Sequence, residues 1–383
     1  MQFKDYLETL TPLQDYEVEI ILNNGEKYLI ENKPGKQGSL RIIQNHLGVN
    51  SKTSEKIDLE KNFLEYFQEW KSDNITHPTI GFLDRFNNEG GEIRKVVKKI
   101  PFVKSHGTGN DFIILDFFDG KLSDLDLTPE LIQKMCDRNF GIGSDGILIV
   151  QNGVNNKFAY RMFNPDGSEA EMCGNGIRCY MKYLVYAGLL KDTKTFVETK
   201  KGVLHLSLVD DLVEVDMGKP ILVDEIIPIA KGVRKVISSG SEFGFTPVSM
   251  GNPHAVIFLD NKNVETHCNV SLQEFDLNKY GKPIESNTDI FPKKVNVEFI
   301  KINSKTDIDM RVFERGAGET LACGTGACAS VVAGVLNGYL THGEKVTVHL
   351  KGGDLVISWA GGADDSVIMR GTAEIVFEGE FII

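Results

Sequence analysis

The sequence predicts an α+β protein with two pseudo-symmetric halves, each a curled, mostly antiparallel sheet around a central helix, preceded by a small α/β extension. Three observations support this prediction. Residues 161–176 match residues 311–326 without a gap, and each of these segments contains one cysteine. A helix-like segment follows each of them, and short alternating strands predominate elsewhere. Solenoid repeats have periods of about 20–50 residues, so a match at this much longer spacing indicates a duplicated half-domain.

Each cysteine of the repeat stands directly before a Gly-x-Gly. Cys173 leads into a predicted helix over 177–187, and Cys323 leads into a predicted helix over 327–336. Glycines before a helix let backbone N–H groups converge on an anion, which the positive end of the helix dipole also attracts. A cysteine at such a position has its pKa lowered. We therefore expect one anion site flanked by two activated thiols.

Two opposed thiols beside one carboxylate site indicate a racemase or epimerase. Inverting the carbon next to a carboxylate requires a base on one face and an acid on the other. N–H donors can stabilise the charge that the carboxylate takes up as the proton leaves. The alternatives are burial of each cysteine as a small apolar residue, and a disulfide between Cys173 and Cys323 under oxidation. No zinc site is expected, because neither Cys-x2-Cys nor His-x3–5-His spacing occurs.

The composition limits the classes of protein to which the chain can belong. The chain has 383 residues, enough for two or three domains, and its apolar and charged fractions are those of an ordinary globular protein. A net charge of −12 argues against nucleic acid as a partner. The start has no signal-peptide pattern, and no 18-residue apolar run predicts a membrane span. Six cysteines are too few for a disulfide scaffold, so a cytoplasmic setting is expected.

Residues 1–99 form an extension with no counterpart in the repeat, and no function is assigned to it. Segments 16–22 and 27–31, separated by Asn-Asn-Gly-Glu, predict a β-hairpin. Residues 54–70 have the apolar spacing of an amphipathic helix, with Ser54 as its N-cap. Residues 87–91 are typical of a linker.

The first half is expected to cover residues 100–217 together with 366–383. Residues 101–116 predict a strand, a Gly-rich turn and a second strand, with Asn110 where the chain leaves the turn. A helix is predicted over 128–138, and residues 141–150 predict a turn that leads into a buried strand. After the cysteine helix, 203–209 and 212–217 alternate as strands.

The second half is expected to cover residues 218–365. Asn252 precedes a proline and is therefore held out of the α region, so that its amide and the His254 ring can both point from a turn. A strand is predicted over 295–301 with Asn296 as its polar member, and residues 373–381 alternate as a closing strand. Glu314 and Arg315 stand where the first half has Asn164 and a proline, which breaks the symmetry of the two halves.

From about Ile100 to its C-terminus the chain resembles the diaminopimelate epimerases, a family of cofactor-independent two-cysteine isomerases. The matching segments are HGTGNDF at 106–112, GIGSDG at 141–146, FNPDGSEAEMCGNGIRC at 163–179, GNPH at 251–254, NVEF at 296–299 and ERGAGETLACGTGAC at 314–328. The resemblance implies interconversion of LL- and meso-diaminopimelate, on the route to lysine and cell-wall peptide. It also implies a homodimer without cofactor or metal.

The resemblance assigns a role to each site residue by position. Cys173 and Cys323 would exchange the proton, and His254 and Glu314 would tune the pKa of these cysteines. Backbone groups of four residues would hold the reacting carboxylate: Gly174, Asn175, Gly324 and Thr325. The amino groups and the distal carboxylate of the substrate would be bound by Asn110, Asn164, Asn252, Asn296, Glu314 and Arg315.

Two positions depart from the family pattern. Some members have a glutamine in the substrate loop where this chain has Gly146, and a tyrosine that supports the dimer is Phe377 here. Three other functions are compatible with the sequence. These are a racemase of another amino acid, a non-catalytic amino-acid-binding protein, and a thiol-redox protein, which the absence of a Cys-x-x-Cys pair disfavours.

Overall fold

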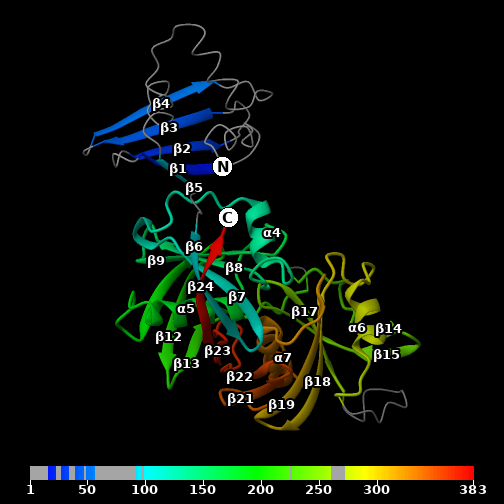
Figure 1. Cartoon of the computed structure of the whole chain (residues 1–383). Helices are drawn as coiled ribbons and strands as arrows, with labels where there is room; N and C mark the ends of the chain where they lie inside the picture. Colours follow the sequence, from blue (N-terminus) through cyan, green and yellow to red (C-terminus); the bar gives the residue numbers. More distant parts are fainter. Residues whose placement is uncertain are drawn as a thin grey trace. The chain divides into compact units, whose positions relative to one another are not determined.

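The computed structural model describes two compact units, Met1–Ile100 with Ile382–Ile383 and Pro101–Phe381. In the first unit it describes the backbone of five strands, and beyond these it describes residues 99–224, 227–259 and 272–383. Figure 1 shows the course of the chain. The predicted site residues lie between 110 and 325 and therefore all belong to the second unit.

The five described strands of the first unit form one antiparallel sheet in the order β4-β3-β2-β1-β5. The predicted hairpin is confirmed as β1 and β2. The predicted N-cap at Ser54 is wrong, because Ser54 lies within β4, paired with Arg41. Residues 55 and 56 of the predicted helix also belong to β4, whereas residues 57–70 and most of the predicted linker lie outside the described residues. The strands are β1 (Tyr16–Leu22), β2 (Lys27–Lys33), β3 (Ser39–His46), β4 (Val49–Lys56) and β5 (Gly91–Lys95).

The second unit contains the same sheet twice. Its first half has the strands β6 (Lys99–Gly107), β7 (Asn110–Asp116), β8 (Ile147–Asn152), β9 (Phe158–Phe163), β11 (Lys194–Thr199), β12 (Gly202–Val209) and β13 (Leu212–Asp216). Its second half has β16 (Thr246–Ser249), β17 (Pro253–Phe258), β18 (Asn296–Ser304), β19 (Asp307–Glu314), β21 (Lys345–Leu350), β22 (Gly353–Ser358) and β23 (Ile368–Gly371).

The strand pairings of the two halves also agree. β7–β8 and β9–β11 are parallel, as are β17–β18 and β19–β21, whereas the other neighbours in each half are antiparallel. Pairing of β13 with β23 joins the two sheets. The predicted pseudo-symmetric halves, each a curled and mostly antiparallel sheet, are therefore confirmed.

Each half surrounds one helix of 13 residues, α5 (Gly174–Tyr186) or α7 (Gly324–Leu336). Both helices begin three residues earlier than predicted, because the glycines themselves take helical positions and Cys173 and Cys323 become the N-caps. The two helices pack against the strands of their own halves, as Figure 1 shows. Their buried faces belong to one apolar core that spans both halves.

The remaining elements lie around this framework. The predicted helix at 128–138 is α4 (Pro129–Cys136), where the Thr128 hydroxyl oxygen accepts a hydrogen bond from the Leu131 N–H. The predicted closing strand is β24 (Glu374–Ile382), a neighbour of β6. A second apolar core lies beneath α6 (Leu277–Glu285) and the β14–β15 hairpin. The other short elements are η1 (Phe118–Gly120), β10 (Glu169–Ala170), β14 (Lys235–Ser238), β15 (Ser241–Gly244) and β20 (Gly318–Glu319).

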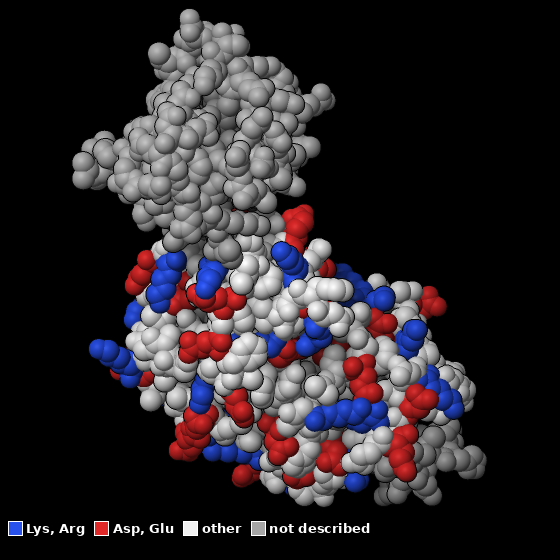
Figure 2. Space-filling view, viewed as in Figure 1, with Lys and Arg blue, Asp and Glu red and all other residues white. Residues whose placement is uncertain are grey.

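The surface of the second unit carries charges of both signs. On the face shown in Figure 2, acidic and basic side chains of the described residues are interspersed. None of the helices that the structure describes is long and apolar enough to span a membrane.

Burial of the central helices predicts a stability difference between two leucines. Leu184 in α5 is fully buried, whereas Leu336 at the end of α7 is 49% exposed. We expect Leu184→Ala to lower the free energy of unfolding by about 2–5 kcal/mol, because it leaves a cavity in the shared core. The matched control Leu336→Ala should cost much less. Urea unfolding measures both, and equal losses would contradict the assignment of α5 to the core.

Candidate active site

A cavity of about 520 Å³ lies where the two repeated loops meet. It is lined from both halves of the second unit, and both cysteines of the repeat face it. Lys201, Glu171 and Gly251 also contribute to its wall. Eleven of the thirteen predicted site residues line the cavity: Asn110, Asn164, Cys173, Gly174, Asn175, Asn252, Glu314, Arg315, Cys323, Gly324 and Thr325.

The first residues of the two central helices abut at the floor of this cavity. A β-carbon added to Gly174 would lie 3.6 Å from the Cα atom of Gly324, and one added to Gly324 would lie 3.6 Å from that of Gly174. Met369 closes the space behind both, 3.3 Å or less from either added carbon. Glycine at both positions therefore lets two helix N-termini present their free N–H groups to the same anion.

Cys173 is the N-cap of α5, and its sulfur lies 3.7 Å from Asn110 Oδ1. Burial raises the pKa of Cys173, although the N–H groups of Gly176 and Asn175 act in the opposite direction. The expectation that the pKa of Cys173 is lowered by the helix N-terminus is therefore wrong. Removal of the sulfur from water outweighs the stabilisation that the helix offers to a thiolate.

Cys323 has a more acidic environment than Cys173. Burial raises the pKa of Cys323 well above its ordinary value, and the carboxylates of Glu314 and Glu298 raise it further. The Thr325 hydroxyl lies 3.5 Å from the sulfur and opposes this shift. The predicted lowering of the pKa is therefore wrong here too. Burial also raises the pKa of Glu314, which accepts hydrogen bonds from the Thr320 hydroxyl and the Cys323 thiol.

His254 lies behind the cavity wall and is fully buried. Its Nδ1 is 2.6 Å from Glu298 Oε1, and its Nε2 is 3.1 Å from Asn252 Oδ1. Glu298 is fully buried as well, and its Oε2 has no hydrogen-bond partner among the described residues. Sequence reasoning missed Glu298, although a glutamate inside the otherwise apolar part of β18 was the signal that could have found it.

Asn110 is held by a charged network at the rim of the cavity. Its Nδ2 donates to Asp145 Oδ2 at 2.7 Å, and Asp145 Oδ1 accepts from Arg138 at 2.7 Å. Arg138 also pairs with Asp111. Burial by itself would raise the pKa of Asp111, but hydrogen bonds from Arg138 and Lys104 lower this pKa to about 2. Asp145 was not predicted as a site residue, and nothing in the turn sequence distinguishes it from an ordinary turn aspartate.

The side-chain amides of two predicted substrate-binding residues make hydrogen bonds within the protein. Asn296 is buried and does not line the cavity, since its amide donates to the Pro253 carbonyl and accepts from the Arg315 N–H at 2.9 Å. Asn164 lines the cavity and donates to Ser168 Oγ at 3.0 Å. Asn296 therefore supports the backbone of Arg315 in this structure.

Gly146, where a departure from the family pattern is expected, lies close to the backbone of β9. A β-carbon at Gly146 would lie 2.6 Å from the carbonyl oxygen of Phe163, a distance that no side chain tolerates without a shift of the backbone. The packing of this turn against Phe163 therefore fits a glycine.

Two cations near the cavity, one of them fully buried, were not predicted from the sequence. Lys201 reaches from the first half to the carbonyl of Met250 in the second at 2.7 Å, and burial lowers the pKa of Lys201. Arg178 is fully buried beneath the start of α5, where it donates to the Gly174 carbonyl and to Thr108 Oγ1, both at 3.1 Å. Arg178 thereby supports the glycine loop from below.

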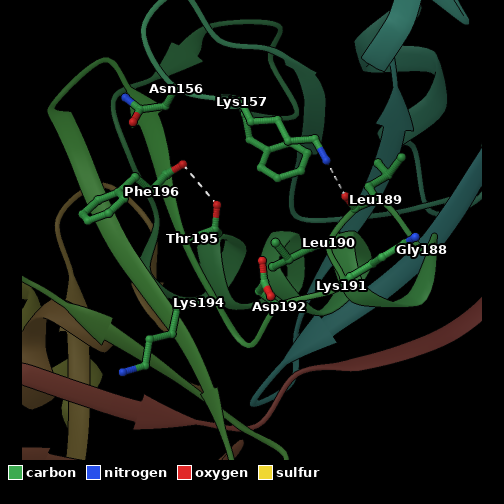
Figure 3. Close-up of a pocket in the computed structure, with 11 residues that line it drawn as sticks. Asn156, Lys157, Gly188, Leu189, Leu190, Lys191, Asp192, Lys194, Thr195 and Phe196 are labelled. Carbon is green, nitrogen blue, oxygen red and sulfur yellow. Dashed lines mark hydrogen bonds between the residues drawn. The ribbon is translucent and has the colours of Figure 1, made fainter.

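A separate cavity of about 570 Å³ lies beside the turn after α5 (Figure 3). The Lys157 ammonium group donates to the Leu189 carbonyl at 2.7 Å, and Thr195 donates to its neighbouring backbone. Its described lining includes no cysteine or histidine. The cavity at the helix N-termini is therefore the better candidate for chemistry.

Solved structures identify the class of fold. A hydroxyproline epimerase from Agrobacterium vitis superposes with a TM-score of 0.51 at 13% identity, over 74% of this chain and 93% of that one. A phenazine biosynthesis protein of the PhzF family from Bacillus anthracis has the same TM-score at 16% identity, over 75% and 100%. The chain therefore shares the fold of these two proteins.

Within that fold, the chain belongs to the diaminopimelate epimerase family, which it matches over residues 102–223 and 246–376. The diaminopimelate epimerase of Desulfitobacterium hafniense is 47% identical over 290 residues, which cover 73% of this chain and 97% of that protein. The enzyme of Pelotomaculum thermopropionicum is also 47% identical, over 73% and 98%. That of Methanococcus maripaludis strain C5 is 45% identical, over 74% and 100%.

The environment of Cys323 predicts how its titration responds to Glu314. A carboxylate beside a thiol disfavours the thiolate, so Glu314→Gln should lower the pKa of Cys323. The rate of alkylation by iodoacetamide, followed over pH with mass spectrometry of the Cys323 peptide, should then reach its midpoint at lower pH than in the native protein. Glu171→Gln, which changes another carboxylate of the cavity wall, should leave that midpoint in place.

Proposed function

We propose that the protein interconverts LL- and meso-2,6-diaminopimelate by a two-base mechanism in which Cys173 and Cys323 are the acid and the base. The observation that carries this proposal is the convergence of both thiols and two helix N-termini on one cavity. The family relationship supports the choice of substrate. No cofactor is needed in this mechanism, because the electrons of the broken C–H bond move into the substrate's own carboxylate.

The reaction begins with the α-carboxylate held by the N–H groups at the start of α5 and α7, contributed by Gly174, Asn175, Gly324 and Thr325. The thiolate of one cysteine removes the α-proton, and the pair of electrons delocalises into the carboxylate. The N–H donors stabilise the charge that develops there. The thiol of the other cysteine then returns a proton to the opposite face, so the product has inverted configuration and the two sulfurs have exchanged protonation states.

The raised pKa values of the two thiols fit this mechanism. A buried thiolate is a stronger base than an exposed one, and abstraction of an α-proton requires a strong base. The ammonium group of a bound substrate would bring a positive charge next to the sulfurs and favour the thiolate. In this proposal His254 and Glu314 adjust the thiol pKa, with Glu314 acting through its contact with Cys323.

Recognition of the amino groups and of the distal carboxylate of the substrate is assigned to the remaining polar wall. Asn110, Asn164 and Asn252 line the cavity, and Glu314 and Arg315 add one charge of each sign. The guanidinium group can take the distal carboxylate in a forked hydrogen bond. Asn296 would act indirectly, by holding the backbone of Arg315.

Loss of either thiol should abolish turnover. We expect Cys173→Ala and Cys323→Ala each to lower epimerisation of LL-diaminopimelate by about 1000-fold or more, since each removes one proton-transfer group. Cys136→Ala, which changes a buried cysteine outside the cavity, should retain activity. Incorporation of deuterium at the α-carbon in D2O, measured by mass spectrometry, reports the reaction. Normal turnover by a well-folded Cys173→Ala variant would refute the two-thiol mechanism.

The cellular setting forms part of the same proposal. We assign the two halves as 100–217 with β24, and 218–371, with the active site between them. The segment 366–383 expected for the first half is thereby shortened, because β23 (Ile368–Gly371) pairs with β22 of the second half. All five described cysteines are free, and reactive thiols require a reducing compartment, which supports a cytoplasmic enzyme. The product would enter lysine and cell-wall precursor synthesis.

A homodimer is proposed on the exposed apolar side chains of β24. Val376 is 53% exposed and Phe377 is 47% exposed, and Phe102 packs edge-on against Phe377. Light scattering after size exclusion should give twice the chain mass of 42.6 kDa. Phe377→Asp should shift the protein toward the monomer, because it places a charge among these apolar side chains. Val154→Asp, at an exposed valine elsewhere, is the control.

A further inference from the structure

The strand registers define which residues of the two halves are equivalent beyond the repeated loops. Phe163 and Phe313 are equivalent in the repeat. Phe163 pairs with Ile147 of β8, and Phe313 pairs with Val297 of β18. One position further along these strands, Leu148 in the first half therefore corresponds to Glu298 in the second.

Independent contacts support this equivalence. A β-carbon added to Gly176 would lie 3.1 Å from Leu148, and one added to its repeat partner Gly326 would lie 2.7 Å from Glu298 Oε1. Equivalent side chains thus face Gly176 in the first half and Gly326 in the second. The side chain is a leucine in the first half and a glutamate in the second.

The next strands outward bring the asparagines of the cavity into register. Ile147 pairs with Ile113 of β7, and Val297 pairs with Ala255 of β17. Three residues before each of these partners stands an asparagine that lines the cavity, Asn110 in the first half and Asn252 in the second. They are therefore pseudo-equivalent residues, one for each half. By the same count, His254 corresponds to Phe112.

Asn110 turns its carbonyl oxygen toward Cys173. Its Nδ2 donates to Asp145 Oδ2 at 2.7 Å, and an ionised carboxylate only accepts hydrogen bonds, so this end of the amide must be the NH2 group. The opposite end, Oδ1, accepts from Asn175 Nδ2 at 3.3 Å and lies 3.7 Å from the Cys173 sulfur.

Asn252 has the reverse orientation. Its Oδ1 faces His254 Nε2 at 3.1 Å, and its Nδ2 donates to Thr325 Oγ1 at 3.2 Å. An amide oxygen only accepts hydrogen bonds, so this orientation of Asn252 goes with a proton on His254 Nε2. Glu298 Oε1, 2.6 Å from Nδ1, holds the other side of the ring and fixes its direction.

We propose that Asp145 and the His254–Glu298 pair are positioning residues that hold Asn110 and Asn252 in opposite amide orientations, so that the pseudo-symmetric cavity offers an acceptor at one end and a donor at the other. The first half has the apolar Phe112 and Leu148 where the second half has His254 and Glu298, and an apolar pair cannot orient an amide. The difference between the halves is therefore built into buried positions that do not touch the substrate.

This inference rests on the proposed function and deepens it. An α-amino acid presents an ammonium group and a carboxylate, and a cavity with identical ends would accept it in two directions. The Asn110 carbonyl accepts from an ammonium group, whereas the free N–H of Asn252 donates to a carboxylate oxygen. The opposed amides would therefore select one direction of binding and determine which stereocentre lies between the two thiols.

A charge exchange tests the orientation of Asn110. We expect Asn110→Asp to lower kcat/KM for LL-diaminopimelate by about 100-fold, because the new carboxylate at position 110 then faces the carboxylate of Asp145 and repels it. Adding Asp145→Asn should restore kcat/KM to within about 10-fold of the native value. The amide at position 145 then donates a hydrogen bond to the carboxylate at position 110. The other oxygen of that carboxylate still faces the cavity.

The matched control is the same substitution at the equivalent asparagine. Asn252→Asp replaces the donor by an acceptor, and Asp145→Asn should give no rescue there. Rescue confined to the Asn110→Asp background supports the proposal. No rescue in either background, or equal rescue in both, overturns it. Melting temperatures close to the native value show that each variant is folded.

A measurement that needs no turnover separates this inference from the proposed function. In 15N-labelled full-length protein, the side-chain amide signals of Asn110 and Asn252 are assigned by their loss in the two Asp variants. Asp145→Asn should shift the signal of Asn110 alone, and Glu298→Leu should shift that of Asn252 alone. If native protein lacks epimerase activity but these shifts occur, only the proposed function fails. If the enzyme is active but the shifts are absent, only the orientation fails.

Discussion

The meeting of two helix N-termini at Gly174 and Gly324 is the constraint on which the active site depends. Their backbones approach so closely that a side chain on either residue would contact the other. This contact brings Cys173 and Cys323, one from each half, to a single cavity. Each half has its own sheet and helix, yet neither contains a complete site. In the proposed two-thiol mechanism the duplication works only as a pair, since an inversion needs two opposed groups.

Burial sets the chemistry of these thiols more strongly than the helices do. The N–H groups at the start of α5 favour the Cys173 thiolate, but removal of water from the sulfur acts in the other direction and prevails. The same low-polarity surroundings would make every fixed N–H donor more effective once a substrate carboxylate occupies the cavity. Exclusion of water thus has two effects. It raises the basicity of the sulfurs, and it strengthens the stabilisation of the charge that develops on the substrate carboxylate.

The pseudo-symmetry is close in the backbone and broken in the side chains. Strand order and register agree between the halves, whereas Phe112 and Leu148 are replaced by His254 and Glu298. The gapless match of 161–176 with 311–326 does not reach these positions, so it does not show which residues of the two halves correspond there. Asp145 also resembled any turn aspartate until its contact with Asn110 was seen. The predicted helix N-cap at Ser54 failed because a strand pairing took precedence over local helix propensity.

The sequence by itself determined the division into halves, the two central helices and the set of residues around the cysteines. These features follow from local patterns, such as apolar spacing along a helix and glycines at its start, that act between neighbours in the chain. Only the tertiary structure decided the pKa shifts of the thiols, the burial of Asn296 and the opposed amides of Asn110 and Asn252. Each of these depends on desolvation and on contacts between segments far apart in the sequence, such as Cys323 with Glu298 and His254 with Glu298.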